Sequence, residues 1–299
     1  MCGIVGLFLK KKELEPDLGR HLSRMLAVLS DRGPDSAGFA VYSQPEEGII
    51  KLTLRGPKAY DWAELKQKLT EKTGLSANID ARDTHAVLSC HPDTSNDVRA
   101  ALHCTAPEVS VAGSGFSMEI YKEVGRPETV TKRFALETMG GSHGVGHTRM
   151  ATESAVTTKG AHPFTSGPDQ CLVHNGSLSN HNSVRRDLVR QGLKFETDND
   201  TEVAAAFLTA EMNKGLNLGE ALERSLSELD GFYTFVVGTA SGFGVLRDPI
   251  ACKPAVMAET NDYVAFGSEY RAVAVLPDIE TAHLWEPEPA RVYFWERSA

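Results

Sequence analysis

The chain opens with Met1-Cys-Gly-Ile-Val-Gly-Leu-Phe-Leu9, an apolar run directly behind the initiator methionine. The stretch from Ile4 to Leu9 is long enough for one buried strand, and three consecutive lysines end it. Such a run is too short for the core of a signal peptide or for a membrane span. The sequence therefore predicts a cytoplasmic protein with no membrane partner, whose own N-terminus is part of the working structure.

Cys2 is the residue of this stretch with reactive chemistry. Its small side chain favours removal of Met1, which would leave a free α-amine on the cysteine itself. A thiol has a pKa of about 8.5 and an α-amine one of about 7.7 to 8.0, so the amine is partly neutral near pH 7 and can accept the thiol proton. Retention of Met1 would exclude this mechanism. By position alone, a small buried residue at the head of a strand is the commoner role.

The composition limits the class of protein. The 299 residues are 41% apolar, and 31 Lys and Arg against 40 Asp and Glu give a formal net charge of -9. These values are typical of a folded protein with a sizeable core, and the charge disfavours nucleic acid as a partner, although a local basic patch is compatible with it. The five cysteines form no Cys-x-x-Cys pair, so neither a metal site nor a disulfide framework is predicted.

Apolar periodicity predicts strands at both ends of the chain and helices between them. A helix is expected over residues 16–29, and strands at 39–42 and 49–54 are expected to pair through the turn between them. Residues 56–133 change character and are predicted to form an inserted subdomain within a single domain of residues 1–299. Further helices are predicted at 182–191, 202–213 and 218–229. The pattern favours an α+β layered fold.

Short motifs spread along the chain hold the other reactive and polar residues. In order, they are Met1-Cys-Gly-Ile-Val-Gly6, Arg32-Gly-Pro-Asp-Ser-Ala-Gly38, Gly146-His-Thr-Arg-Met-Ala-Thr152, His162-Pro-Phe164, His174-Asn-Gly176 and Asp200-Thr-Glu202. Together they resemble the class II glutamine amidotransferases, which are N-terminal-nucleophile hydrolases. The resemblance covers about residues 1–55 and 140–270 and implies a four-layer αββα sandwich with an inserted α/β subdomain.

The resemblance implies that Cys2 attacks the side-chain amide of L-glutamine and forms a thioester. Asn175 and Gly176 would supply an amide side chain and a backbone N–H to the oxyanion. A tetrahedral intermediate needs such donors, since loss of one costs about 2.7 to 4 kcal/mol in characterised hydrolases. The alternative is an ordinary Asn-Gly hairpin turn. The apolar strand before the pair and the predicted helix after it disfavour that alternative.

The resemblance also assigns the groups that bind the substrate. Arg149 would bind the α-carboxylate of glutamine and Asp200 its α-ammonium, which together would select a free amino acid. A surface ion pair for Arg149 and a helix cap for Asp200 are the simpler alternatives. Asp198 lies close enough to compete with Asp200, and Asp200 is preferred because Asp-Thr-Glu-Val matches the family's run best.

Other residues of the motifs are expected to shape the site. Thr152 and His162 would shape the substrate pocket, and Arg32, Gly33 and Asp35 would form a supporting loop beside the nucleophile. The remaining histidines, His147 and His174, are flanked by apolar residues and glycines, so buried core histidines are expected rather than metal ligands.

The ammonia-consuming partner is the last expectation from the resemblance. No such domain follows residue 299, so a partner chain would supply it, as in glutamate synthase-like systems, including the N-methylglutamate synthase type. Their synthase subunits carry FMN and iron–sulfur clusters, whereas this chain is expected to hold no cofactor. Two alternatives stay open: a catalytically silent glutamine-sensing or structural subunit, and an N-terminal-nucleophile hydrolase that acts on another amide. The insertion at 56–133 is interpreted as a surface elaboration or as a docking platform.

Overall fold

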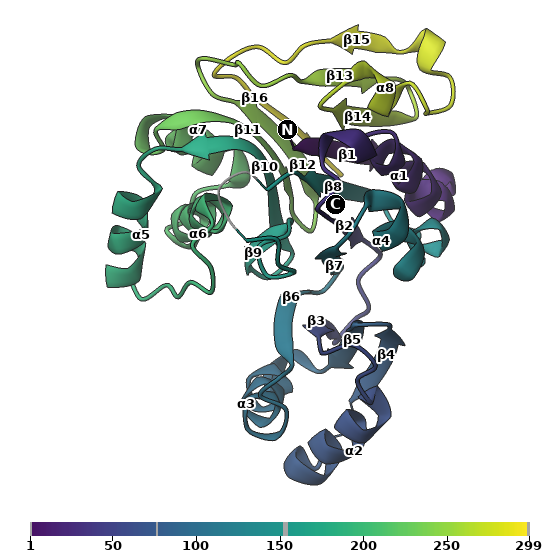
Figure 1. Ribbon diagram of the computed structural model, residues 1–299, viewed down its shortest axis with the longest axis vertical. Coiled ribbons are helices and arrows are strands. Elements are labelled where there is room, and N and C mark those ends of the chain that lie inside the picture. Colours follow the sequence, from purple (N-terminus) through teal and green to yellow (C-terminus); the bar gives the residue numbers. More distant parts are fainter. Residues whose placement is uncertain (1, 76, 152–154, 298–299) are drawn as a thin grey trace.

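Two antiparallel sheets stacked on each other form the body of the protein. The structure, a computed structural model, describes residues 2–75, 77–151 and 155–297 (Figure 1). The larger sheet has seven strands in the order β15 (His283–Trp285), β13 (Val256–Glu259), β14 (Tyr263–Gly267), β1 (Gly3–Leu9), β8 (His143–Arg149), β2 (Ser36–Tyr42) and β7 (Met118–Val124). The smaller has five, in the order β16 (Val292–Glu296), β12 (Gly242–Arg247), β11 (Gly231–Gly238), β10 (Gln170–Leu178) and β9 (Phe164–Gly167).

Successive side chains of each strand point to opposite faces of its sheet, so each sheet has one face toward the other sheet and one toward the helices. On β1, Ile4 and Phe8 point into the core between the two sheets, whereas Val5 and Leu7 point to the outer core. Gly6 also faces the second sheet, and any Cβ there would overlap the ring of Phe243. The short apolar run at the N-terminus is therefore a central strand, buried on both faces.

Helices cover the outer face of each sheet, and Figure 1 shows the two groups on opposite sides. The seven-stranded sheet is covered by α1 (Leu18–Ala27), α4 (Pro127–Arg133) and α8 (Tyr270–Val273), and the five-stranded sheet by α5 (His181–Arg190), α6 (Asp200–Asn213) and α7 (Leu218–Glu228). Short 3-10 helices occur at η1 (Lys12–Asp17), η2 (Ser30–Arg32), η4 (Leu136–Thr138) and η5 (Ile279–Thr281). This αββα order confirms the predicted fold class.

A separate four-stranded sheet lies below this body in Figure 1. Its strand order is β4 (Asn78–Arg82), β5 (His85–Cys90), β3 (Ile50–Arg55) and β6 (Ser110–Gly115), and it packs with α2 (Trp62–Thr73), η3 (Pro92–Thr94) and α3 (Ser95–Thr105). Leu52, Leu65, Leu69, Leu88 and Val98 belong to its own apolar core. We call residues 50–115 the inserted subdomain from here on.

Two expectations about this region differ from the structure. The expected hairpin of residues 39–42 and 49–54 is wrong, because β2 is flanked by β8 and β7 and has no free edge for β3. The sequence predicts the insertion at residues 56–133, but β7 pairs with β2 in the main sheet and α4 packs on α1. Periodicity along one chain indicates a strand but does not name its partner, so the boundary could not be read from it.

Among the residues that the structure describes, no helix is long and apolar enough to span a bilayer.

Candidate functional site

Strand alternation brings Cys2, Arg149 and Asn175 to one end of the space between the sheets. Cys2 directly precedes β1, two residues before the inward-facing Ile4. Arg149 ends β8, four residues after the inward-facing Val145, and Asn175 is two residues after the inward-facing Val173 on β10. The ends meet because Gly3 pairs with Thr148 and because His147 Nε2 lies 3.0 Å from the His174 carbonyl oxygen in the other sheet.

The backbone of Cys2 is held by a charged network. Arg32 Nε donates to the Cys2 carbonyl oxygen at 3.0 Å, and the Arg32 guanidinium pairs with Glu269. Partial burial acts to raise the pKa of Glu269, but hydrogen bonds from Arg32 and Arg271 and their charges outweigh it and lower that pKa. The thiol itself is half-buried, with Sγ 4.0 Å from the Met150 carbonyl oxygen. The backbone of Cys2 is therefore held in place, while its side chain is only partly buried.

The predicted supporting loop clamps the end of β8. Gly33 packs against the backbone of Thr148, where any Cβ would overlap the peptide group. The Asp35 amide donates to the Arg149 carbonyl oxygen at 3.0 Å, and Asp35 Oδ2 accepts from the Ala151 amide at 2.8 Å. Arg32, Gly33 and Asp35 thus lie beside Cys2 and Arg149 and hold them in place through backbone contacts.

Asn175 has an unused hydrogen-bond donor. The residue is 3% exposed, and its Nδ2 has no partner among the described residues. A buried polar group without a partner costs about 1 to 3 kcal/mol, so a ligand that accepts from it recovers that free energy. The next residue, Gly176, has a φ of 152°, and any Cβ there would overlap the Phe232 carbonyl oxygen. Only glycine fits this position beside the unused donor.

Two residues of opposite charge, Arg149 and Asp200, lie near this end of the sheets. Arg149 is 6% exposed and its Nη1 lies 3.3 Å from the Ala155 carbonyl oxygen. Asp200 begins α6, where its Oδ2 accepts from the Leu178 amide at 3.0 Å and its Oδ1 lies 3.7 Å from His174 Nδ1. Burial acts to raise the pKa of Asp200, but His174 and the Leu178 amide outweigh it and hold that pKa at about 2. The carboxylate is therefore charged at neutral pH.

A buried histidine cluster lies behind Asp200. His147 and His162 stack with ring centroids 4.0 Å apart, and Thr201 Oγ1 lies 2.7 Å from His162 Nε2 and 3.0 Å from His174 Nδ1. Burial lowers the pKa of His147 to about 3 and that of His162 well below its usual value. These two rings are neutral at physiological pH. His147 and His174 are core residues, as predicted, and His162 lies with them, 5% exposed. Thr152 lies outside the described residues.

Several residues that hold the site were missed in the sequence. Ser268 brackets the start of β1, since its Oγ accepts from the Ile4 amide at 2.9 Å and its own amide donates to the Ile4 carbonyl oxygen at 3.0 Å. The neighbouring Glu269 is the partner of Arg32, and Thr201 joins the histidines. Ser268 and Glu269 directly follow β14, and their position there depends on the pairing of β14 with β1.

Comparisons with known proteins identify the family of the chain. Residues 147–275 match the family model described as a glutamine amidotransferase domain. The glutamine amidotransferase-like protein GlxB of Rhizobium meliloti (strain 1021) is 63% identical over 99% of this chain and 98% of its own length. A putative glutamine amidotransferase of Methanothermobacter thermautotrophicus is 32% identical over 98% and 99% of the two chains.

A solved structure gives the same fold. Glutamine phosphoribosylpyrophosphate amidotransferase from B. subtilis, complexed with ADP and GMP, aligns with a TM-score of 0.63 at 20% identity, over 99% of this chain and 47% of that longer one. This likeness concerns the fold alone. With the full-length relatives and the arrangement of the motifs, it supports one assignment: the chain belongs to the class II glutamine amidotransferases.

Proposed function

We propose that the chain hydrolyses L-glutamine to glutamate and ammonia with Cys2 as the nucleophile. Removal of Met1 would free the α-amine of Cys2, which accepts the thiol proton. The thiolate attacks the side-chain amide carbon, the carbon–nitrogen bond breaks as the amide nitrogen takes up the proton and leaves as ammonia, and a thioester is left. Water then cleaves the thioester and regenerates the thiol. The partly buried side chain of Cys2, on a backbone that Arg32 holds in place, supports this role.

The observation that carries the proposal is the buried, unpaired Nδ2 of Asn175 at the same end of the sheets as Cys2. A donor without a protein partner is preorganised for charge that develops only during the reaction. We assign the Asn175 amide and the Gly176 backbone N–H to the oxyanion.

Substrate selection follows from the two charged residues. Arg149 would bind the α-carboxylate as a planar fork, and the ionised Asp200 would bind the α-ammonium. His162 and Thr152 would shape the pocket, and His162 does so from within the core, behind Thr201. A peptide-bound glutamine lacks both free charges and would be excluded.

We further propose that the ammonia passes to a synthase subunit of glutamate synthase or N-methylglutamate synthase type, whose subunits carry FMN and iron–sulfur clusters. The chain aligns with GlxB over nearly the whole of both proteins, whereas it matches 47% of the phosphoribosylpyrophosphate amidotransferase. All five cysteines are free, which suits a reducing compartment such as the cytoplasm.

Intact mass before and after treatment with a glutamine-analogue diazoketone tests this function. We expect loss of Met1 followed by one adduct, which Cys2→Ser abolishes. Cys104→Ser is the matched control because Cys104 is an exposed cysteine of the inserted subdomain, and it should keep the adduct. Retained Met1 without an adduct would favour instead a silent subunit that senses glutamine or supports the complex.

A further inference from the structure

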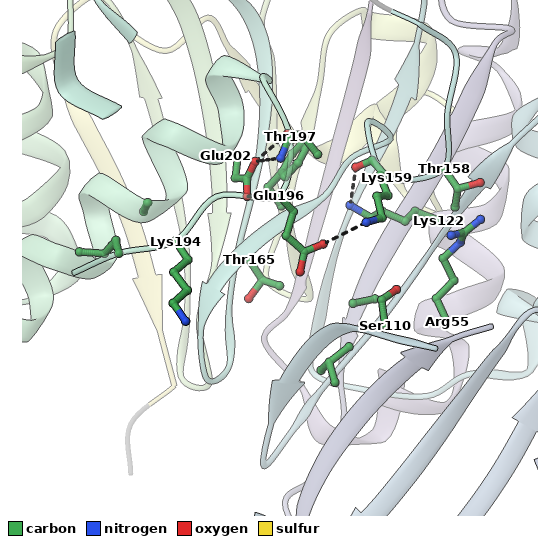
Figure 2. Close-up of a pocket in the computed structure, with 15 residues that line it drawn as sticks. Arg55, Ser110, Lys122, Thr158, Lys159, Thr165, Lys194, Glu196, Thr197 and Glu202 are labelled. Atoms are coloured by element: carbon green, nitrogen blue, oxygen red, sulfur yellow. Dashed lines mark hydrogen bonds and ion pairs between the residues drawn. The ribbon is translucent and has the colours of Figure 1, made fainter. Parts of the chain in front are cut away.

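A second polar pocket lies where the inserted subdomain meets the body. It encloses about 300 Å³, which is at the lower end of the range for small-molecule sites. Arg55 and Ser110 line it from the subdomain, while Lys122 of β7, the loop residues Thr158 and Lys159, and the segment before α6 line it from the body. Figure 2 shows Arg55 and Lys159 on one side of the pocket and Lys194 on the other.

The pocket has an excess of positive charge, whereas the chain as a whole is negatively charged. Four of its lining residues are cationic (Arg55, Lys122, Lys159 and Lys194) and two are acidic (Glu196 and Glu202), whereas the whole chain carries -9. The Glu202 carboxylate is already occupied, since it accepts from the amides of Glu196 and Thr197 at 2.7 and 2.8 Å and from Thr197 Oγ1 at 2.6 Å. The pocket is therefore a local positive field within an acidic protein.

Two of the cations have no anionic partner in the described part of the chain. Neither Arg55 nor Lys194 forms an ion pair there, and Arg55 Nε is buried without a hydrogen-bond partner. Lys159 is 3.9 Å from Glu196, but both side chains are more than half exposed, and such pairs contribute little. Lys122 is engaged, donating to the carbonyl oxygens of Ala161 and Pro163 at 2.8 and 3.2 Å. Arg55 and Lys194 are thus the groups available to a ligand.

The other lining residues indicate which chemical groups that ligand would carry. Ser110, Thr158 and Thr165 add hydroxyl groups, while Phe164 and Leu193 add apolar surface. Arginine, lysine and hydroxyl groups are typical partners of phosphate oxygens. We propose that this pocket binds a small phosphomonoester, with the phosphate at Arg55 and the organic part extending across the pocket toward Leu193 and Lys194.

The pocket borders both segments that carry the substrate-binding charges. Thr158 and Lys159 lie in the connection that follows Arg149, and Lys122 ties this connection to β7. Glu202 lies in the first turn of α6, which also holds Asp200. A ligand that draws these segments toward Arg55 would shift the groups assigned to glutamine. Occupancy of the pocket is therefore expected to alter the KM for glutamine, and this coupling rests on the proposed function.

Calorimetry with glucose 6-phosphate and AMP tests the binding, with glucose, adenosine and 2-oxoglutarate as matched probes. We expect the phosphomonoesters alone to bind, and Arg55→Gln to weaken their binding about tenfold or more, as expected for loss of one charged hydrogen bond. Lys194→Gln should weaken binding less, because Lys194 lies on the other side of the pocket. Lys194 is exposed, so its substitution should not disturb folding. Lys66→Ala, an exposed lysine of α2 outside the pocket, is the control and should bind as the wild type does.

The calorimetry is repeated with Cys2→Ala, in which glutamine hydrolysis is blocked. Binding to the pocket is then measured independently of the proposed glutaminase activity. Any of four results would overturn the site. They are equal affinity for the neutral probes, preferential binding of 2-oxoglutarate, no binding of any probe, and equal affinity of Arg55→Gln and Lys66→Ala for the phosphomonoesters. If wild-type protein binds AMP or glucose 6-phosphate but its KM for glutamine changes less than about fivefold, the low end of allosteric coupling, the coupling is overturned.

Discussion

The end of the stacked sheets and the boundary of the inserted subdomain hold their polar side chains in different ways. Arg149 and Asn175 are 6% and 3% exposed and are carried by central strands. Lys159 and Lys194, in the second pocket, are exposed residues of connecting segments. Chemistry that requires fixed geometry is thus built into the core of the body, whereas a charge that has only to attract an anion can lie on exposed side chains at the boundary of the inserted subdomain.

The largest effect is expected at Cys2, at the end of the stacked sheets. We expect Cys2→Ala to reduce glutaminase kcat at least about a thousandfold, because loss of a nucleophile removes the covalent route. Thermal unfolding should hardly change, since the residue is half-buried. Steady-state ammonia release measures the effect, with Cys104→Ala as the control. Near-normal turnover in Cys2→Ala would assign the chemistry elsewhere.

Asn175→Ala is expected to have the next largest effect. Loss of an oxyanion donor lowers kcat about a hundredfold to a thousandfold. Because Nδ2 makes no hydrogen bond in the described structure, its removal leaves no donor or acceptor newly unpaired, and the melting temperature should fall little. Asn78→Ala, on the exposed face of β4, is the matched control. A variant that loses stability but keeps kcat would make Asn175 a structural residue only.

A smaller effect is expected for Asp200→Asn. Loss of one charged hydrogen bond should raise the KM for glutamine about tenfold to a hundredfold, with a smaller change in kcat. The variant keeps the acceptor for the Leu178 amide, so the start of α6 is preserved. Asp198→Asn, the neighbouring aspartate, should leave KM unchanged. The opposite ranking of the two variants would shift the assignment to Asp198.

The two regions should also separate in stability. Leu69 is 1% exposed in the subdomain core, and Leu69→Ala should cost about 2 to 5 kcal/mol there. Hydrogen exchange should then increase within residues 50–115, while basal glutamine turnover stays within about twofold because the Cys2 site has a separate core. An equal loss of turnover and protection throughout the body would show that the two regions unfold together.

The smallest expected effect is on the stability of the fold at acidic pH. The pKa of Asp200 is about 2 in the folded protein and about 3.9 in an unfolded chain, so its carboxylate stabilises the fold above pH 4 and this contribution is lost as pH falls toward 2. The contribution is on the order of 1 to 2 kcal/mol after allowance for partial exposure. Denaturant unfolding between pH 5 and 2 should show a shallower acid loss in Asp200→Asn. Identical curves would contradict the depressed pKa.

Local patterns were sufficient for most of the body. The predicted helix at 202–213 corresponds to α6 and the predicted strand at 4–9 to β1, because each shows its own apolar period over several residues. Short elements such as β9 and β15 were missed, since three or four residues carry little periodicity. The boundary of the insertion was missed for another reason. The residues of β7 form a strand whether they belong to the insertion or to the main sheet, and only the pairing of β7 with β2 places them in the body.

The amino-acid sequence by itself determined most of the longer strands and helices, the family, and the candidates Cys2, Arg149, Asn175 and Asp200, because these depend on short local patterns and motifs. Only the tertiary structure decided that Glu269 neutralises Arg32, that Asn175 keeps an unused donor, and that Arg55 and Lys194 face one pocket. Each of these features joins residues from distant segments. Their interaction exists only when the strands have paired, and no local pattern encodes it.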